Sequence, residues 1–478
     1  MQSCFLRPHT LLLLCGVLLA FQMISPRPMS ADEGDDLVVH EWGTFTTFSG
    51  SDGVFLDWRP LEGDSDLPDF VVTRIDSRPG ARFAKSRVRG RVRMETPITY
   101  FYTDRVRRVK VAVDFPKGLL TEFYPPVRSM MPPVNETALT TIGEKVGRGR
   151  LDWGQLTLVP QSKMVPDLAD EKLQQELANR ASIGATPRSN RNDHYAAARY
   201  TDSALVLFNQ EMPSINNKLQ ILNQGMNVTP GLHAEKFLFY RGVGDFEMPL
   251  SAATWKKNES GNSSDLPGTY TIASDRIRVT NRSQHPIVGG IYFKVEGEKI
   301  RMTSLASIAP GHAITTARPV EQLDGVGELN RQMKSLLVGQ GLFEKEADAM
   351  LATWDNAWFT EQGSRVLYIV PQAITDEMLP LHVSPKPKKT LRVLVGRLEM
   401  LSVAEEKRMT DLVTESVKQR AAFWAKKPGK GAVYPLPKSL TDYGRMAEPS
   451  LARVRLLAKD QSVKEEARLL IDALRNKE

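Results

Sequence analysis

His40-Glu41-Trp42-Gly43-Thr44-Phe45-Thr46-Thr47-Phe48-Ser49-Gly50 is the stretch around which the rest of the chain is organised. It is rich in β-branched and aromatic residues, which favour strands, and a turn through Gly53 leads to a second short apolar run. This pattern predicts a β-hairpin whose first strand lies in the core. Successive strand side chains point to opposite faces, so His40 shares a face with Trp42 and not with Glu41. His40 and Glu41 could hold one metal ion only if Gly43 marks a bulge.

A second strand is expected from Lys85 to Glu95, where arginines alternate with small or apolar residues. The arginines are Arg87, Arg89, Arg91 and Arg93. A period of two predicts a row of guanidinium groups that faces water. Tyr100 and Tyr102, in the next apolar stretch, are assigned to the same binding surface.

The basic character of the chain is concentrated in this region. Between Arg74 and Lys110 the twelve basic residues exceed the three acidic ones by nine, whereas the whole chain carries only +7. Such a surface predicts binding of an anionic ligand or an acidic partner. Protection of an exposed sheet edge by charge is the structural alternative.

Later segments give further expectations for the fold. Residues 96–103 and 109–115 are expected to form a hairpin, and an apolar stripe from Phe343 to Trp358 predicts a buried helix. Residues 366–370 read as a strand buried on both faces that pairs with 391–395. Beyond Ser402 the chain is expected to be mainly helical. The pairs Ser402/Glu405 and Ser462/Glu465 both have the spacing of a capping box.

Together these features predict an α+β fold with a β-rich, sandwich-like N-terminal two-thirds and a mixed, mainly helical C-terminal region. Four segments are expected in the 478 residues. They are a signal peptide (1–31), a β-rich domain with the Arg-rich strand (32–165), a second β-rich part with short helices (166–318) and an α/β region ending in helices (319–478).

The N-terminus has the pattern of an export signal. A short cationic start precedes the apolar run from Leu11 to Phe21, which is typical of a secretory signal and short for a membrane span. The sequence therefore predicts a secreted or periplasmic protein, or a membrane-anchored one if the segment is not cleaved. Both cysteines, Cys4 and Cys15, lie in this segment, so the mature chain would contain no disulfide and no thiolate nucleophile.

Candidate catalytic and metal-binding residues are few. The HExxH and Gly-x-Ser-x-Gly signatures are absent from the sequence. Asp193 and His194 place a carboxylate beside an imidazole, as in a general base, although Asp193 also suits a helix N-cap. His40, His233 and Glu235 are candidate ligands for a divalent metal, because His233 and Glu235 would share one face of a strand. The sequence implies no other cofactor.

Four segments also carry a resemblance to a known group of proteins. These are His40 to Phe45, Glu95-Thr96-Pro97 with Tyr100-Phe101-Tyr102, Glu235 to Gly242, and Arg365 to Tyr368. They resemble motifs of exported bacterial proteins of unassigned function, and the similarity would extend over most of the mature chain. The resemblance implies export and a shared architecture.

The leading hypothesis is an exported, non-catalytic binding protein with a basic surface for an anionic glycan, a lipid headgroup or an acidic partner. The alternatives are an exported hydrolase that uses histidines and carboxylates, with or without a metal, and a structural or assembly component of the cell envelope. Nucleic acid is disfavoured because no recognisable reading module is present. Membrane contact is expected only through the N-terminal segment.

Overall fold

The computed structural model describes residues 36–58, 67, 71–73, 90–132, 148–161, 195–210, 231–254, 276–441 and 443–476. The expected signal peptide lies outside these residues, as do Arg87, Arg89, Asp193 and His194. Within the described ranges, no helix has both the length and the apolar character needed to cross a bilayer.

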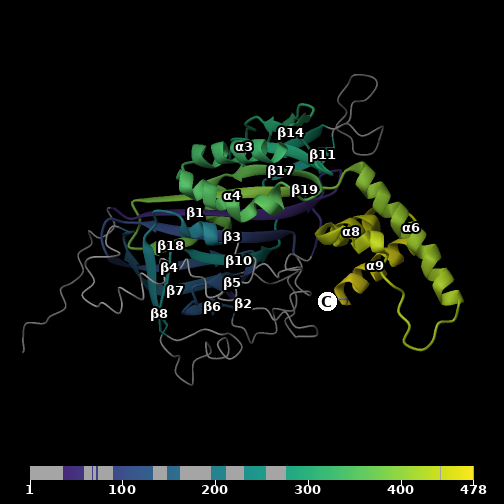
Figure 1. Ribbon diagram of the computed structural model, residues 1–478, viewed down its shortest axis with the longest axis horizontal. Coiled ribbons are helices and arrows are strands. Elements are labelled where there is room, and N and C mark those ends of the chain that lie inside the picture. Colours follow the sequence, from purple (N-terminus) through teal and green to yellow (C-terminus); the bar gives the residue numbers. More distant parts are fainter. Residues whose placement is uncertain are drawn as a thin grey trace, which may run out of the picture.

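A ten-stranded sheet forms the centre of the molecule (Figure 1). Its strands, in spatial order, are β16 (Val320–Gln322), β14 (Lys299–Leu305), β13 (Gly290–Glu296), β17 (Gly363–Val370), β19 (Lys389–Met400), β1 (Val38–Ser49), β3 (Val92–Tyr102), β10 (Leu238–Gly244), β5 (Gly118–Tyr124) and β2 (Val72–Thr73). Strand β1 pairs with β19 in parallel and with β3 in antiparallel orientation. From Val39 to Ser49 every residue of β1 is buried, so the expected core strand is confirmed.

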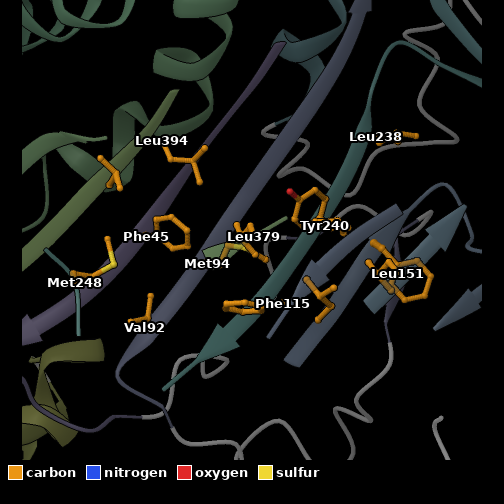
Figure 2. Packing of buried hydrophobic residues seen from close by; sticks show 14 of the residues in the cluster. Phe45, Val92, Met94, Phe115, Leu151, Leu238, Tyr240, Met248, Leu379 and Leu394 are labelled. Carbon is orange, nitrogen blue, oxygen red and sulfur yellow. The ribbon is translucent and has the colours of Figure 1, made fainter. Parts of the chain in front are cut away.

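A second, six-stranded sheet contributes to the main apolar core. It consists of β18 (Leu381–Ser384), β4 (Arg107–Phe115), β7 (Gly149–Val159), β8 (Leu205–Gln210) and β9 (Gly231–Glu235), with β6 (Ser129–Met131) paired to β7. The two sheets contribute Phe45, Met94 and Phe115 to one buried cluster, whose packing is drawn in Figure 2. A three-stranded sheet of β11 (Leu250–Thr254), β12 (Ile277–Asn281) and β15 (Ala313–Thr315) adds to the same core.

Two helices cover the opposite face of the ten-stranded sheet. They are α3 (Gly325–Gly339) and α4 (Glu344–Trp358). The apolar stripe of α4 packs with Trp42 in a second cluster, which confirms that this stripe belongs to the core. Phe343, just before α4, is half exposed. The short helix η4 (Ala196–Arg199) contributes Ala198 to the second cluster, whereas α5 (Gln372–Met378) packs against the main core through Ile374 and Met378.

The C-terminal helices form a third cluster beside the end of the large sheet (Figure 1). They are α6 (Val403–Ala425), α7 (Lys438–Thr441), η5 (Gly444–Met446), α8 (Ala447–Leu457) and α9 (Gln461–Asn476). The Ser402/Glu405 capping box is present at the start of α6, as expected. The Ser462/Glu465 box is wrong, because α9 begins at Gln461 and the Ser462 N–H donates to Asp460 Oδ1 at 2.8 Å.

The architecture confirms the α+β class and its β-rich N-terminal two-thirds. The two strands expected around 366–370 and 391–395 also pair, as β17 with β19, although residues 366–370 lie opposite 394–398. The hairpin expected from 96–103 and 109–115 is wrong, because β3 and β4 belong to different sheets. The turn between them carries the chain across the sandwich, so that Phe101 and Val109 meet in the same core. The large sheet takes strands from all three segments that follow the expected signal peptide.

Candidate binding surface

The turn after β1 fixes the C-terminal helices against the end of the large sheet. Gly53 has φ +82° and donates its N–H to Gly50 O at 3.0 Å, and an isolated bridge joins Ser49 to Phe55. A Cβ at Gly50 would lie 2.6 Å from the guanidinium carbon of Arg453 on α8. A larger residue at position 50 would displace the Arg453 guanidinium from its place in this contact. The predicted hairpin is thus present as a short form that serves as the docking point of α8.

Arg453 itself is bound from both sides of this contact. Its Nη2 lies 2.8 Å from Asp52 Oδ2, and its Nε lies 2.7 Å from Glu406 Oε1 on α6. Ser51 donates to the same Glu406 through its N–H and its hydroxyl, each at 2.8 Å. Because Arg453 points toward this turn, other side chains of α8 are left to face the space beside it.

That space is an open groove of about 770 Å³ between the sheet end and the helices α8 and α9. One wall is formed by residues 54–58 with Arg91, and the other by residues of α8 and α9. Val54 and Leu456 line it with exposed fractions of 46% and 63%. Large apolar side chains that are exposed in a concave surface favour binding of another molecule.

The charged residues of the groove are mixed in sign. Its cations are Arg91, Arg455, Lys464 and Arg468, and its anions are Asp57, Asp245, Glu247, Glu448 and Glu465. Arg468 is paired with Glu465 at 2.5 Å. Within the described part of the chain, Arg455 and Lys464 take part in no ion pair, so their charges are available to a ligand.

Of the two arginines of the expected row that the structure describes, Arg91 lies in this groove. Its Nε lies 2.6 Å from Asp245 Oδ1, and its Nη1 lies 3.4 Å from Glu247 Oε1. Neighbouring carboxylates therefore screen this guanidinium.

Arg93 departs from the expected row because it is buried. Strand β3 carries it into the interior with 7% exposure, and its Nε lies 2.9 Å from Glu95 Oε1. Glu95 in turn accepts a hydrogen bond from Thr46 at 2.5 Å. The expectation that Arg93 faces water is wrong. Glu95, two residues along the same strand, shares its face and neutralises it.

His40 and Glu41 lie on opposite faces of β1, as strand alternation requires. His40 is 1% exposed, and its Nδ1 lies 2.9 Å from Glu346 Oε2 on α4. Glu41 binds Arg392 on β19, with 2.6 Å between Oε2 and Nη2. A bulge is present here, but it lies in β3 opposite Gly43, since Trp42 pairs with Ile98 and Thr44 with Glu95. It leaves His40 and Glu41 apart.

Of the two tyrosines assigned to the binding surface, Tyr100 is buried and Tyr102 is half-buried. Tyr100 is fully buried and donates its hydroxyl to Ala198 O at 2.8 Å. Tyr102 donates to Glu346 Oε1 at 2.7 Å. Burial, and after it the negative charge of Glu346, raises the pKa of Tyr102, so the phenol stays protonated as a donor.

Of the candidate metal ligands, His40 and Glu235 are not brought together. Glu235 on β9 forms an ion pair with Arg199, with 2.8 Å between Oε2 and Nη2, and His40 belongs to the other large sheet. His233 is a residue of β9 opposite Phe208. In the described ranges, no group of three or more His, Cys, Asp and Glu side chains is arranged to hold a metal. The Asp193–His194 hypothesis falls outside those ranges.

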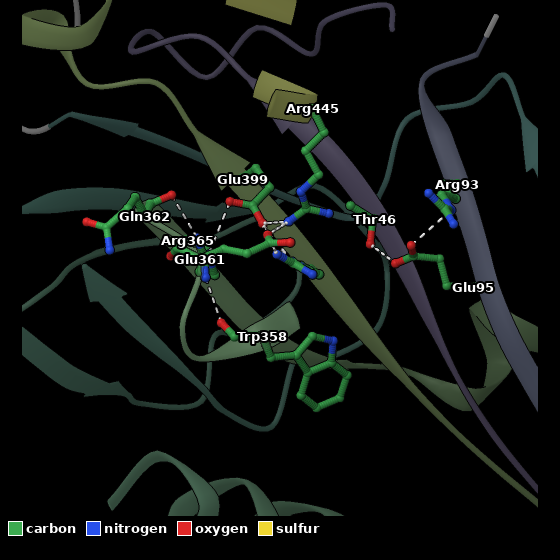
Figure 3. Close-up of polar contacts among 10 residues, drawn as sticks. Thr46, Arg93, Glu95, Trp358, Glu361, Gln362, Arg365, Glu399 and Arg445 are labelled. Carbon is green, nitrogen blue, oxygen red and sulfur yellow. Dashed lines mark hydrogen bonds and ion pairs between the residues drawn. The ribbon is translucent and has the colours of Figure 1, made fainter. Parts of the chain in front are cut away.

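A further set of buried charges joins the sheet to the C-terminal helices (Figure 3). Glu399 accepts from Arg365 at 3.1 Å and from Arg397 at 2.6 Å. Glu361 binds Arg397 at 2.6 Å and also contacts Arg445. Arginines in this part of the interior are therefore neutralised by carboxylates, and the cluster fixes the fold.

Sequence reasoning did not identify the groove or its free cations. Arg455 and Lys464 lie in two helices with ordinary surface charge patterns, so neither stands out in the sequence. The exposed apolar residues Leu456 and Leu457 at the end of α8 were the available signal, because a helix end seldom exposes two adjacent leucines without a partner.

Comparisons with known proteins give only distant likenesses. No protein-family model matches the chain, and no curated protein matches it. Among solved structures, the mu homology domain of Fcho1 from Danio rerio with a bound Eps15 peptide has a TM-score of 0.27 and 7% identity, over 78% of this chain and 98% of that one. The yeast delta-COP-I mu-homology domain complexed with a Dsl1 WxWxV peptide has a TM-score of 0.23 and 7% identity, over 77% and 97% of the two chains. These TM-scores are too low to establish a common fold, and they leave the function open.

Proposed function

We propose that this chain is an exported binding protein and that it binds a polypeptide partner in the groove between the sheet end and helices α8 and α9. Export is inferred from the N-terminal sequence alone. The observation that carries the binding proposal is the groove itself, with exposed Val54 and Leu456 beside the unpaired cations Arg455 and Lys464.

The composition of the groove favours a protein over an anionic glycan. A uniformly charged polyanion placed there would meet the exposed carboxylates of Asp57 and Glu247, and like charges at close range oppose binding. A polypeptide that alternates apolar and acidic side chains would cover Leu456 and pair with Arg455 and Lys464. Of the three ligands suggested by the sequence, an acidic protein partner is the one that the composition of this groove supports.

The experiment uses the full chain with labelled synthetic peptides. A fluorescein-labelled 12-residue peptide alternating leucine and glutamate is titrated against the protein by fluorescence anisotropy, alongside the same peptide with lysine replacing glutamate. Binding of the acidic peptide, with an affinity that falls as salt is raised, is expected because charge pairs across an exposed rim are screened.

Matched variants assign the binding to the groove. Leu456→Ser and the pair Arg455→Ser, Lys464→Ser should each weaken binding about tenfold or more. Leu457→Ser, which changes a half-exposed leucine outside the groove, should leave it unchanged. Equal affinity of both peptides, or equal loss in Leu456→Ser and Leu457→Ser, would rule out the groove as the site.

A further inference from the structure

A second surface lies at the far end of α6 and differs in character from the groove. Figure 1 shows α6 running along the outside of the C-terminal cluster, with its end and the following loop farthest from the sheets. Two large apolar side chains stand exposed there, Trp424 at 47% and Val433 at 79%. We call residues 418–438 the basic tip.

The charge of the basic tip is of one sign. It contains six basic residues and no acidic one: Lys418, Arg420, Lys426, Lys427, Lys430 and Lys438. Arg420 is used internally, since its Nε lies 2.5 Å from Glu466 Oε2, and Lys418 lies 3.6 Å from Glu415. The other four lysines are exposed and, within the described ranges, take part in no ion pair. The basic tip therefore carries four available positive charges in the same segment as the exposed Trp424.

Aromatic and cation–π contacts hold the basic tip in a fixed conformation. Tyr434 is 8% exposed and lies under the Arg420 guanidinium, whose carbon is 4.4 Å from the ring centroid. Phe423 packs edge-on against the same ring, with centroids 5.7 Å apart. These contacts fold the loop back on α6, so that Trp424 and Val433 are held outward on a fixed support.

The helix dipole accounts for only part of this arrangement. Cations near a helix C-terminus are stabilised by the negative end of the macrodipole, which suits Lys426 and Lys427. It does not account for Lys430 and Lys438, which lie beyond the helix, nor for the exposed side chains of Trp424 and Val433 in the same segment. Exposed apolar side chains together with several lysines in one segment favour binding at the boundary of an anionic bilayer, where indole lies at headgroup depth and lysines meet lipid phosphates.

We propose that the basic tip docks the protein on bilayers that contain anionic phospholipid. Trp424 and Val433 enter the headgroup boundary, while Lys426, Lys427, Lys430 and Lys438 bind the lipid phosphates. This contact is separate from the groove and does not depend on the function proposed for it. It places membrane contact at the C-terminal helices as well as at the N-terminal segment suggested by the sequence.

The test measures flotation of the full chain with vesicles. Vesicles of phosphatidylcholine with one quarter phosphatidylglycerol should bind the protein, and vesicles of phosphatidylcholine alone should not. Because each lysine near an anionic surface contributes about fivefold in affinity, the variant Lys426→Ser, Lys427→Ser, Lys430→Ser should lose about a hundredfold. The loss should be accompanied by a smaller salt dependence.

A matched control removes the same charge elsewhere. Lys386, Lys388 and Lys389 are three exposed lysines at the start of β19, the end opposite to the one that leads into α6. Changing all three to serine should alter vesicle binding by less than twofold. If both triple variants lost vesicle binding equally, the binding would depend on the net charge of the whole protein and not on the basic tip. That result would overturn the proposal.

The indole gives an independent readout. Vesicles with brominated acyl chains should quench tryptophan fluorescence of the wild-type chain, and Trp424→Ser should lose that part of the quenching although six other tryptophans remain. Binding to heparin without binding to anionic vesicles, or vesicle binding that is unchanged in Trp424→Ser, would contradict bilayer docking. Circular dichroism confirms that each variant is folded.

Discussion

Arg392 of β19 binds Glu41 of β1 through an ion pair of 2.6 Å in which both side chains are fully buried. Tyr240 donates to the same carboxylate at 2.6 Å. The pair lies in the centre of the sandwich and joins the two parallel strands of the large sheet. Buried charges of this kind are costly to separate, because the remaining partner stays in the interior without compensation.

Arg392→Met is therefore expected to lower the free energy of unfolding by about 3–5 kcal/mol. Combining it with Glu41→Gln should cost less than the sum of the two single changes, since the double variant leaves no unpaired charge. Urea unfolding midpoints measure the cycle. Strict additivity of the two changes would show that the ion pair is not energetically coupled.

His40→Ala tests the contact to Glu346. The change removes one of the donors to a carboxylate that is 0% exposed and that keeps the donors Tyr102 and the Phe343 N–H. A hydrogen bond to a charged group contributes about 1.5–3 kcal/mol, so the variant should be less stable by about this amount. The control is His382→Ala, which breaks a 2.7 Å contact to Asp114 in which the imidazole is 53% exposed. It should leave the urea midpoint nearly unchanged. Equal shifts in the two variants would contradict a structural role for His40.

Burial of Lys236 is expected to make the free energy of unfolding rise with pH in the alkaline range. Burial lowers the pKa of its ammonium group in the folded protein, while the unfolded chain keeps the ordinary value of about 10.4. Between these two values the unfolded chain binds more protons, so the free energy of unfolding rises with pH in that window. Lys236→Met should lack this rise. Parallel pH profiles of the two proteins, from urea unfolding between pH 7 and 10.5, would refute the prediction.

Lys427 ends α6 in the left-handed region, with φ +50°. A residue with a Cβ is disfavoured there, so Lys427→Gly is expected to raise the free energy of unfolding by about 0.5–1 kcal/mol. Lys426, with φ −74°, is the matched control. Lys426→Gly removes the same charge but adds backbone freedom, and it should lower stability. Thermal unfolding of the two variants should show shifts of opposite sign.

Local sequence patterns predicted where strands form better than they predicted which strands pair in a sheet. The β-branched and aromatic composition of residues 40–48 and the apolar run at 366–370 are local features of the sequence, and both strands form where expected. The partner of β3 was missed because sheet pairing is set by packing across the sandwich. The β3 bulge was missed because it depends on Thr96, a β-branched residue at φ +55° that no sequence pattern identifies.

The candidate surfaces were harder to predict than the fold. A run of arginines suggested one basic face, but Glu95 and Asp245 neutralise the two that the structure describes. The basic tip carries fewer charges, and its signal was the lack of acidic residues near Trp424. Availability of a charge depends on its neighbours in space, and sequence alone does not supply them.

The partnership of β1 with β19 also constrains how the molecule is made. Glu41 and Arg392 are 351 positions apart, so a ribosome must deliver most of the chain before the central strand acquires its second neighbour. Long-range pairing of this kind slows folding and leaves apolar strands uncovered meanwhile. Until β19 is synthesised, residues 38–49 lack the parallel neighbour that completes their burial.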